Sequence, residues 1–325
     1  MKYTLNYKPE MKPETKSFFV KNDNKIVAIC PLILEDNNGV KEFSFGNNFG
    51  PAPAFSDFLT SKLKDKVAKL IFKHIDKLAK DFQVKRARLK FSILNKSFIE
   101  ASECEFNYLM KFGYLDVSLN TQVIDLSQTL DELRNSLRHG HDSDVDKAAK
   151  EMTVEFFDEN NIFPEMFNNY IELHHKAAGR VTRPRSTFDL MYDLIKEGKA
   201  FLVGAKKDNV FAGFSYFFLF KNNVYYGSSC NNPDVEDLPI AHFIQWKTIE
   251  YMNKKKNKFY EIGWQNFSDT LSDFPSQKEI DIARFKRGFG GQTVPLFMGE
   301  KYYDKDFFLK VYQDRITRYA DSIKN

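Results

Sequence analysis

Residues 200–229 read AFLVGAKKDNVFAGFSYFFLFKNNVYYGSS. Three apolar runs in this stretch, 200–205, 210–220 and 224–229, are separated by Lys207-Asp208-Asn209 and Lys221-Asn222-Asn223. Asp and Asn tolerate the positive φ angles of tight hairpins. The stretch therefore predicts three antiparallel strands that follow one another along the chain.

The residues that follow alternate between helix and strand patterns. The predicted order is a helix from about Asp237 to Lys254, a strand Phe259–Gly263, a short helix Gln277–Arg287 and a strand Gln292–Met298. Pro239 is tolerated in the first turn of the first of these helices.

The same order occurs earlier in the chain. Apolar runs at Ser17–Val20, Ile26–Leu34 and Val40–Phe45 are followed by a long amphipathic helix within Leu59–Phe82. After it we predict a strand Arg86–Phe91, a helix of about Lys96–Lys111 and a strand Tyr114–Asp125. Meander, helix, strand, helix, strand is the element order of the GNAT (acetyltransferase) fold, and this sequence predicts it twice.

The fold class expected from this repeat is α/β (α+β), with two GNAT-like domains, 1–120 and 121–300. Each domain is expected to have a mixed, largely antiparallel sheet flanked by helices. Thr129 and Glu132 form a capping box that begins a helix, and further helices are predicted at Phe163–Ala178 and Ser186–Lys196. An amphipathic helix within 301–325 is expected to pack on the first domain through Phe308, Tyr312, Ile316 and Tyr319.

Composition limits the classes of protein to consider. The 325 residues carry 48 Lys plus Arg against 44 Asp plus Glu, a net charge of +4 that does not by itself indicate nucleic-acid binding. Three distant cysteines give no zinc or disulfide spacing. The first residues do not form a signal peptide, and the most apolar run, Val210–Phe220, is too short for a membrane span. We therefore expect a cytoplasmic protein without a membrane span.

Two motifs make the interpretation more specific. YEIG at 260–263, followed by ARFKRGFGG at 283–291, is similar to the "fElG … FKrGFGg" end of FemAB-like proteins. LHHKAAGRVTRP at 173–184 resembles a segment of a subgroup associated with surface-polysaccharide synthesis. The resemblance covers about 122–299 well, and the first copy resembles the family only as a degenerate relative.

The resemblance implies that an acyl or aminoacyl group passes directly from a bound ester or thioester to an acceptor amine. Two features depart from the family. The long helical hairpin of FemA proteins that use charged tRNA is absent, and the run Asp142–Asp146 is acidic where many relatives are basic. The loop by which ordinary GNAT enzymes hold coenzyme A is missing from Ser228–Ile240. Walker A, GxGxxG and GxSxG motifs are also absent.

Two residues are candidates for catalysis. Glu261 lies in the strand that borders the active-site cleft of GNAT domains, where a carboxylate can accept the proton of the amine. His242 lies in the first turns of the helix that follows the meander, and a helix N-terminus favours neutral imidazole. The structural alternatives are a buried ion pair for Glu261 and a packing role for His242.

Other residues are candidates for substrate binding because Arg and Lys recognise phosphate and carboxylate groups. The candidates are Arg138, His139, Arg180, Thr182, Arg183, Lys286 and Arg287. The structural alternatives are solvated loops and a glycine-rich turn after Arg287. The two histidines of His139-Gly140-His141 would diverge on a helix, so we predict no metal site.

These observations predict an N-acyltransferase that acts on the amine of an amino sugar or cell-envelope precursor, one linked to a nucleotide, in envelope or polysaccharide biosynthesis. No tightly bound cofactor is expected. Acyl-CoA is favoured as co-substrate, and aminoacyl-tRNA is the other candidate donor. The alternatives are an aminoacyl-tRNA-dependent ligase of the peptidoglycan type and a non-catalytic protein that binds an envelope precursor.

Overall fold

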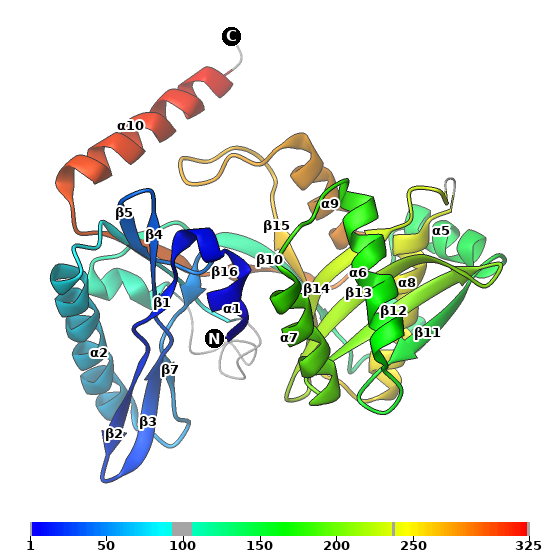
Figure 1. The fold of residues 1–325 in the computed structure, drawn as a ribbon, viewed down its shortest axis with the longest axis horizontal. Helices are drawn as coiled ribbons and strands as arrows, with labels where there is room; N and C mark the ends of the chain where they lie inside the picture. The colour runs from blue at the N-terminus through cyan, green and yellow to red at the C-terminus, as the bar shows by residue number, and fades with distance from the viewer. Residues whose placement is uncertain (1, 93–105, 236–237, 324–325) are drawn as a thin grey trace. The chain divides into compact units, whose positions relative to one another are not determined.

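The computed structural model describes residues 2–92, 106–235 and 238–323 (Figure 1). The chain forms two compact units. Unit 1 contains Met1–Leu119, Phe267–Ser276 and Pro295–Asn325, and unit 2 contains Asn120–Asn266 and Gln277–Val294. The chain therefore passes from one unit to the other more than once.

Unit 2 is built on one sheet with the strand order β11-β12-β13-β14-β15-β10-β16. Its strands are β10 (Leu119–Asp125), β11 (Thr153–Phe157), β12 (Ala200–Lys207), β13 (Val210–Phe220), β14 (Asn223–Asn231), β15 (Phe259–Gln265) and β16 (Gln292–Leu296). The β12–β13 and β13–β14 hairpins are antiparallel, as the meander predicted, whereas β14 and β15 run parallel. The sheet is therefore mixed and largely antiparallel.

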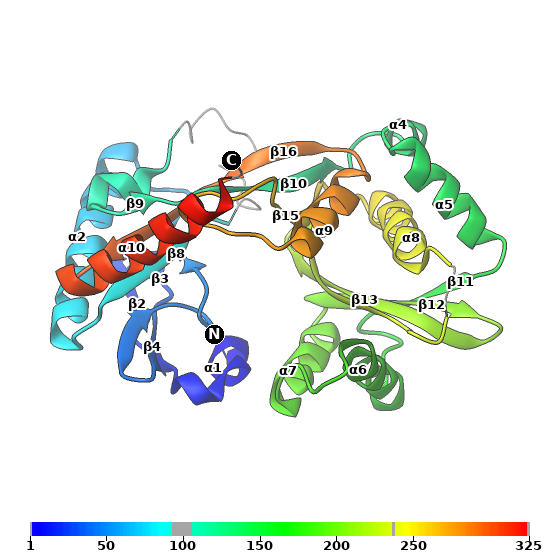
Figure 2. The same cartoon turned by 90° about the horizontal axis from the view of Figure 1, so that it is seen from above.

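Helices cover both faces of this sheet (Figure 2). They are α4 (Leu130–Asn135), α5 (His139–Ala149), α6 (Pro164–Ala178), α7 (Arg185–Lys196), α8 (Ile240–Lys254) and α9 (Gln277–Arg287). On one face, α5 and α8 enclose an apolar core with Phe217, Tyr260 and Ile262. On the other face lie α6 and α7, and the Tyr216 hydroxyl of β13 donates to the Met191 carbonyl of α7 at 2.8 Å. The predicted capping box of Thr129 and Glu132 is present at the start of α4.

Unit 1 contains two sheets, with the strand orders β1-β4-β5-β8-β17-β9 and β2-β3-β7, and β6 pairs with β8. The strands are β1 (Glu14–Thr15), β2 (Phe18–Asn22), β3 (Lys25–Cys30), β4 (Ile33–Asn37), β5 (Val40–Phe43), β6 (Gly50–Pro51), β7 (Ala54–Phe55), β8 (Arg86–Lys90), β9 (Leu115–Asp116) and β17 (Met298–Tyr302). The helices are α1 (Lys2–Tyr7), α2 (Ser61–Asp81), α10 (Lys305–Ser322) and the 3-10 helices η1 (Pro9–Met11) and η2 (Tyr108–Phe112). The predicted long helix is α2, whose buried side chains Val67, Ile71, Phe72 and Ile75 form the core with β3, β4 and β8.

Three predicted strands are divided in the structure. The run Ile26–Leu34 breaks at Pro31 into β3 and β4, which belong to different sheets, because proline cannot donate a ladder hydrogen bond. The run Tyr114–Asp125 becomes β9 in the sheet of unit 1 and β10 in the sheet of unit 2. Similarly, Gln292–Met298 ends as β16, and β17 continues in unit 1.

Two further expectations concern helices. Most of the predicted helix Lys96–Lys111 falls in 93–105, outside the described residues, and its last part is η2. Phe308 and Tyr312 of α10 contact the Tyr302 ring in unit 1, with centroids 5.1 and 6.0 Å away. Ile316 and Tyr319, predicted for the same packed face, are exposed.

Candidate active site

The candidate site lies where β14 and β15 stop pairing. Among the described residues, these parallel strands pair at three positions, the last of which joins Tyr225 to Glu261. Beyond that point β14 continues to Asn231 and β15 to Gln265. The sheet of unit 2 therefore opens directly after Glu261.

The corresponding strands of unit 1 behave differently. Parallel pairing of β5 with β8 ends at Phe43 and Ala87, but Gly50 and Pro51 of β6 then pair with Leu89 and Lys90 on the same edge of β8. In unit 1, β6 therefore pairs with β8 at the position that corresponds to the opening in the sheet of unit 2.

Glu261 points away from the α8 face of the sheet. The preceding residue, Tyr260, donates to Gln245 of α8 at 2.5 Å, and successive strand residues face opposite sides. The Glu261 side chain is only 6% exposed and accepts a hydrogen bond from Thr121 of β10 at 3.0 Å. Burial raises the pKa of Tyr225, on the neighbouring strand, and the charge of Glu261 raises it further.

Lys286 of α9 lies within electrostatic reach of Glu261. Burial lowers the pKa of Lys286, and the charge of Glu261 partly opposes this effect. The ammonium lies 2.9 Å from the position that a Cβ atom would take on Gly263, whose φ is +115°. A side chain at position 263 would therefore displace the lysine from β15.

His242 lies in a separate aromatic cluster. Its ring is edge-on to those of His141 of α5 (4.4 Å) and Phe285 of α9 (4.8 Å), and its Nε2 lies 3.4 Å from Asp144. Burial lowers the pKa of His242 to about 4, helped by His141 and Arg138 and opposed by Asp144. His242 is therefore neutral near pH 7, but it does not lie on the sheet face to which Glu261 points. Helix α9 contacts both groups, because Phe285 faces His242 and Lys286 faces Glu261.

Four of the candidate binding residues fall into two groups. The first contains Arg138 and Arg287, together with Arg284, which was not predicted. Burial lowers the pKa of Arg287, and the charges of Arg138 and Arg284 lower it further. Arg287 donates to Gln265, the last residue of β15, at 2.8 Å. Arg287 therefore lies near the end of β15, and guanidinium groups are suited to binding phosphates.

The second group lies on the α6 and α7 face. His174 of α6 contacts Thr182 through Nδ1 at 3.1 Å and Ser228 of β14 through Nε2 at 3.2 Å. Arg183 lies 3.5 Å from the same Nε2, and its guanidinium stacks over Phe188. Burial lowers the pKa of His174 to about 4, and Arg183 lowers it further, so that this imidazole is also neutral.

The structure does not bring all predicted residues together. Arg180 and His139 are exposed and lie outside both groups. Sequence reasoning missed Tyr225, Ser228 and Thr121. Only strand pairing places Tyr225 and Thr121 near Glu261, and only the packing of α6 on β14 places Ser228 beside His174. Within the described ranges, no three His, Cys, Asp or Glu residues are arranged to hold a metal ion.

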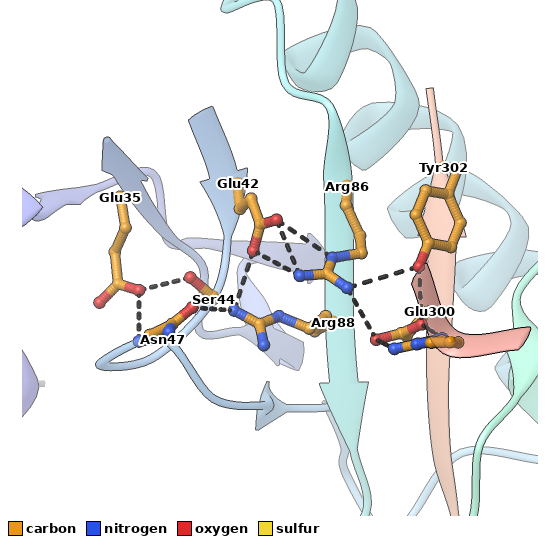
Figure 3. Close-up of polar contacts among 9 residues, drawn as sticks. Glu35, Glu42, Ser44, Asn47, Arg86, Arg88, Glu300 and Tyr302 are labelled. Carbon is orange, nitrogen blue, oxygen red and sulfur yellow. Dashed lines mark hydrogen bonds and ion pairs between the residues drawn. The ribbon is translucent and has the colours of Figure 1, made fainter. Parts of the chain in front are cut away.

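A buried polar cluster in unit 1 was also not predicted (Figure 3). The ionic cluster consists of Glu35, Glu42, Ser44, Asn47, Arg86, Arg88, Glu300, Tyr302 and Arg315. Arg86 of β8 binds Glu42 of β5 at 2.9 Å and Glu300 of β17 at 3.1 Å. Arg88 binds Glu42 and Asn47, each at 2.8 Å.

Glu300 of β17 accepts hydrogen bonds from Arg86, Arg315 and Tyr302. It is 2% exposed and is paired with both Arg86 and Arg315. Burial alone would raise its pKa, but the hydrogen bond from Arg315 and the two guanidinium charges outweigh burial and lower it. Three carboxylates and three guanidinium groups balance in charge, so the ionic cluster ties β5, β8, β17 and α10 together.

Comparison with known proteins identifies the fold. No family model matches the sequence, and no curated protein matches it. Among solved structures, FemX is similar over 95% of this chain and 93% of its own, with a TM-score of 0.64 and 13% identity. The C-terminal domain of a putative lysylphosphatidylglycerol synthetase from Agrobacterium fabrum covers 92% of this chain and 86% of its own (TM-score 0.62, 10% identity).

A tandem GNAT protein from the clavulanic acid biosynthesis pathway is similar over 89% of this chain and 83% of its own, with a TM-score of 0.52 and 14% identity. The predicted fold class, two GNAT-like domains with mixed sheets flanked by helices, is thereby confirmed. No helix in the described ranges has both the length and the apolar character needed to cross a membrane.

Proposed function

We propose that unit 2 is an N-acyltransferase centred on Glu261, in which an acceptor amine attacks the carbonyl of a bound acyl donor. The observation that carries this proposal is a buried carboxylate at the point where β14 and β15 separate, with Lys286 of α9 nearby. As the amine nitrogen bonds to the carbonyl carbon, Glu261 takes the proton that the nitrogen loses. The bond between the carbonyl carbon and the leaving group then breaks, and the leaving sulfur or oxygen takes up a proton.

The neighbours of Glu261 support this role. Thr121 donates a hydrogen bond that orients the carboxylate, and Lys286 lies near enough for the charge of Glu261 to act on its pKa. Tyr225 keeps its proton at neutral pH because burial and the charge of Glu261 raise its pKa, so its hydroxyl can donate a hydrogen bond beside Glu261. His242, which faces another part of unit 2, is then a packing residue rather than the base.

We further propose that the acceptor is an amino sugar or cell-envelope precursor linked to a nucleotide. The cluster of Arg138, Arg284 and Arg287 supports a phosphorylated substrate. The polar side chains of Thr182, Arg183 and Ser228 around His174 support binding of sugar hydroxyl groups on the α6 and α7 face.

The test is an amine-acylation assay with nucleotide-linked amino sugars as acceptors, comparing wild type with Glu261→Gln. We expect turnover to fall by about 10²–10⁴, the usual contribution of a general base. The matched control is Glu155→Gln, which makes the same substitution at an exposed glutamate of β11 and should leave turnover unchanged. Thermal melts establish that each variant is folded. Wild-type turnover in a folded Glu261→Gln protein would refute the assignment.

The same assay distinguishes the donors. We favour a small thioester such as acyl-CoA over aminoacyl-tRNA, since the helical hairpin of tRNA-dependent FemA proteins is absent. Reaction only with aminoacyl-tRNA would replace this choice with a ligase of the peptidoglycan type, for which the similarity to FemX is the supporting observation. Binding of acceptor without turnover from either donor would favour a non-catalytic precursor-binding protein.

A further inference from the structure

Lysines line one side of α2 in unit 1. Spacings of four, three, four, four and three residues place six of them along a single stripe of the helix. These residues, the lysine stripe, are Lys62, Lys66, Lys69, Lys73, Lys77 and Lys80, and all six are exposed. At 1.5 Å per residue the stripe is about 27 Å long.

The lysine stripe is not neutralised by the protein. None of the six makes an ion pair within the part of the chain that the structure describes, and α2 as a whole carries seven lysines against three aspartates. Because the opposite side of α2 is buried in the core of unit 1, the helix is held firmly with these charges outward. The net charge of +4 for the whole chain conceals this local concentration.

A shallow pocket adjoins the centre of the lysine stripe. Lys69 and Lys73 line it together with Lys111 of η2, and its volume is about 460 Å³. Asp65 and Asp76 also line it, but Asp76 already accepts hydrogen bonds from Lys301 at 2.7 Å and Tyr303 at 2.8 Å. Three ammonium groups around a hollow of this size suit a phosphate group.

Apolar side chains flank the same surface. Leu70, between two stripe lysines, is 61% exposed, and Phe106 is 49% exposed. The Lys111 ammonium lies 4.8 Å from the centre of the Phe106 ring, which places this ring beside the pocket. Exposed apolar groups next to a row of cations match the two layers of a bilayer surface, where anionic headgroups cover acyl chains.

We propose that α2 docks unit 1 on an anionic phospholipid bilayer, with a headgroup phosphate in the pocket between α2 and η2. A bilayer fits better than RNA because the stripe contains no arginine, the residue that pairs bidentately with phosphates and stacks on bases. RNA would also leave Leu70 and Phe106 without an apolar environment. The proposal is independent of the chemistry assigned to Glu261.

The test is co-sedimentation of the full chain with phosphatidylcholine vesicles, with and without phosphatidylglycerol. We expect binding only to the vesicles that contain phosphatidylglycerol, and weaker binding as salt increases. The triple variant Lys66→Gln, Lys69→Gln, Lys73→Gln should bind on the order of a hundredfold more weakly. Each lysine near an anionic membrane surface strengthens binding by a similar factor, about fivefold, and the variant removes three of them.

The matched control is Lys254→Gln, Lys255→Gln, Lys256→Gln at the end of α8, which removes the same charge from exposed positions in unit 2. It should bind vesicles as wild type does. Equal loss in both triple variants would mean that only net charge matters and would overturn the proposal. Failure to bind vesicles, together with RNA binding that the α2 variant abolishes, would assign the stripe to nucleic acid instead.

Discussion

The buried ion pairs of Glu300 with Arg86 and Arg315 contribute to the stability of unit 1. Removing one partner of a buried ion pair leaves the other charge uncompensated, which typically costs about 3–5 kcal/mol. Glu300→Gln keeps the size of the side chain but leaves Arg86 and Arg315 without this anion. We expect a loss of stability of that order at neutral pH, measured by urea unfolding.

The effect of pH on this variant has a definite sign. The pKa of Glu300 is lower in the folded chain than its usual 4.5, so its stabilisation is complete above that value. It is lost as the pH falls through the lower folded value, and the difference between wild type and Glu300→Gln should shrink there. Glu14→Gln, which removes an exposed pair with Lys16, is the control and should change nothing measurable. A difference independent of pH would contradict the assigned charge.

At the scale of single residues, the sequence predicted several members of the candidate site but not the residues that lie next to them in the fold. Glu261 lies at the opening of the sheet, where the element order placed it. No sequence pattern reveals that the Lys286 ammonium lies so close to Gly263 that a Cβ atom there would collide with it. The predicted binding residues Arg138 and Arg287, far apart in the sequence, lie near each other because the Arg138 amide donates to the Gly288 carbonyl at 2.9 Å.

Among the elements, the junction of α5 with α9 depends on close packing at a glycine. His141 is buried, and its Nε2 donates to the Phe285 carbonyl at 2.8 Å. A Cβ atom on Gly288 would lie 2.2 Å from that nitrogen. Gly288→Ala should therefore cost about 1–3 kcal/mol, as overpacking usually does, and thermal unfolding measures it.

Gly140 in α5 provides the comparison, because nothing lies within 4 Å of the Cβ that alanine would add there. Gly140→Ala should leave stability unchanged or raise it by up to about 1 kcal/mol, through the helix preference of alanine. If both variants have the same melting temperature, the packing of His141 does not require a glycine at position 288.

Helices were predicted more closely than strands for a physical reason. The stripes of α2, α6 and α9 repeat over many residues, so their limits in the sequence agree with the structure to within a few positions. A short apolar run shows that a strand exists but not which sheet it joins. The run Tyr114–Asp125 divides because Ser118, between β9 and β10, bonds through its hydroxyl to the Met298 amide and to Asp116.

At the scale of the whole molecule, unit 1 is assembled from distant parts of the chain. Its strand β17 lies between β8 and β9 and pairs with both, and it carries Glu300 into the ionic cluster (Figure 3). A chain that ends at residue 119 would lack β17 and α10, and it would leave Arg86 and Arg88 with one carboxylate fewer. In the structure, the first copy of the repeat is therefore joined in its sheet by elements from the end of the chain, which its element order did not suggest.

We expect a fragment of residues 1–119 to show no cooperative unfolding transition by circular dichroism. Joining the same residues to 295–325 through a short glycine-serine linker should restore one, because β17 and α10 then complete the sheet and the charge balance. A short linker is enough, since the Val117 amide donates to the Met298 carbonyl at 3.2 Å. The linked fragment with Glu300→Gln should melt below the linked wild type. Cooperative unfolding of residues 1–119 alone would show that β17 adds to a sheet that is already stable, and that unit 1 does not depend on the returning strand.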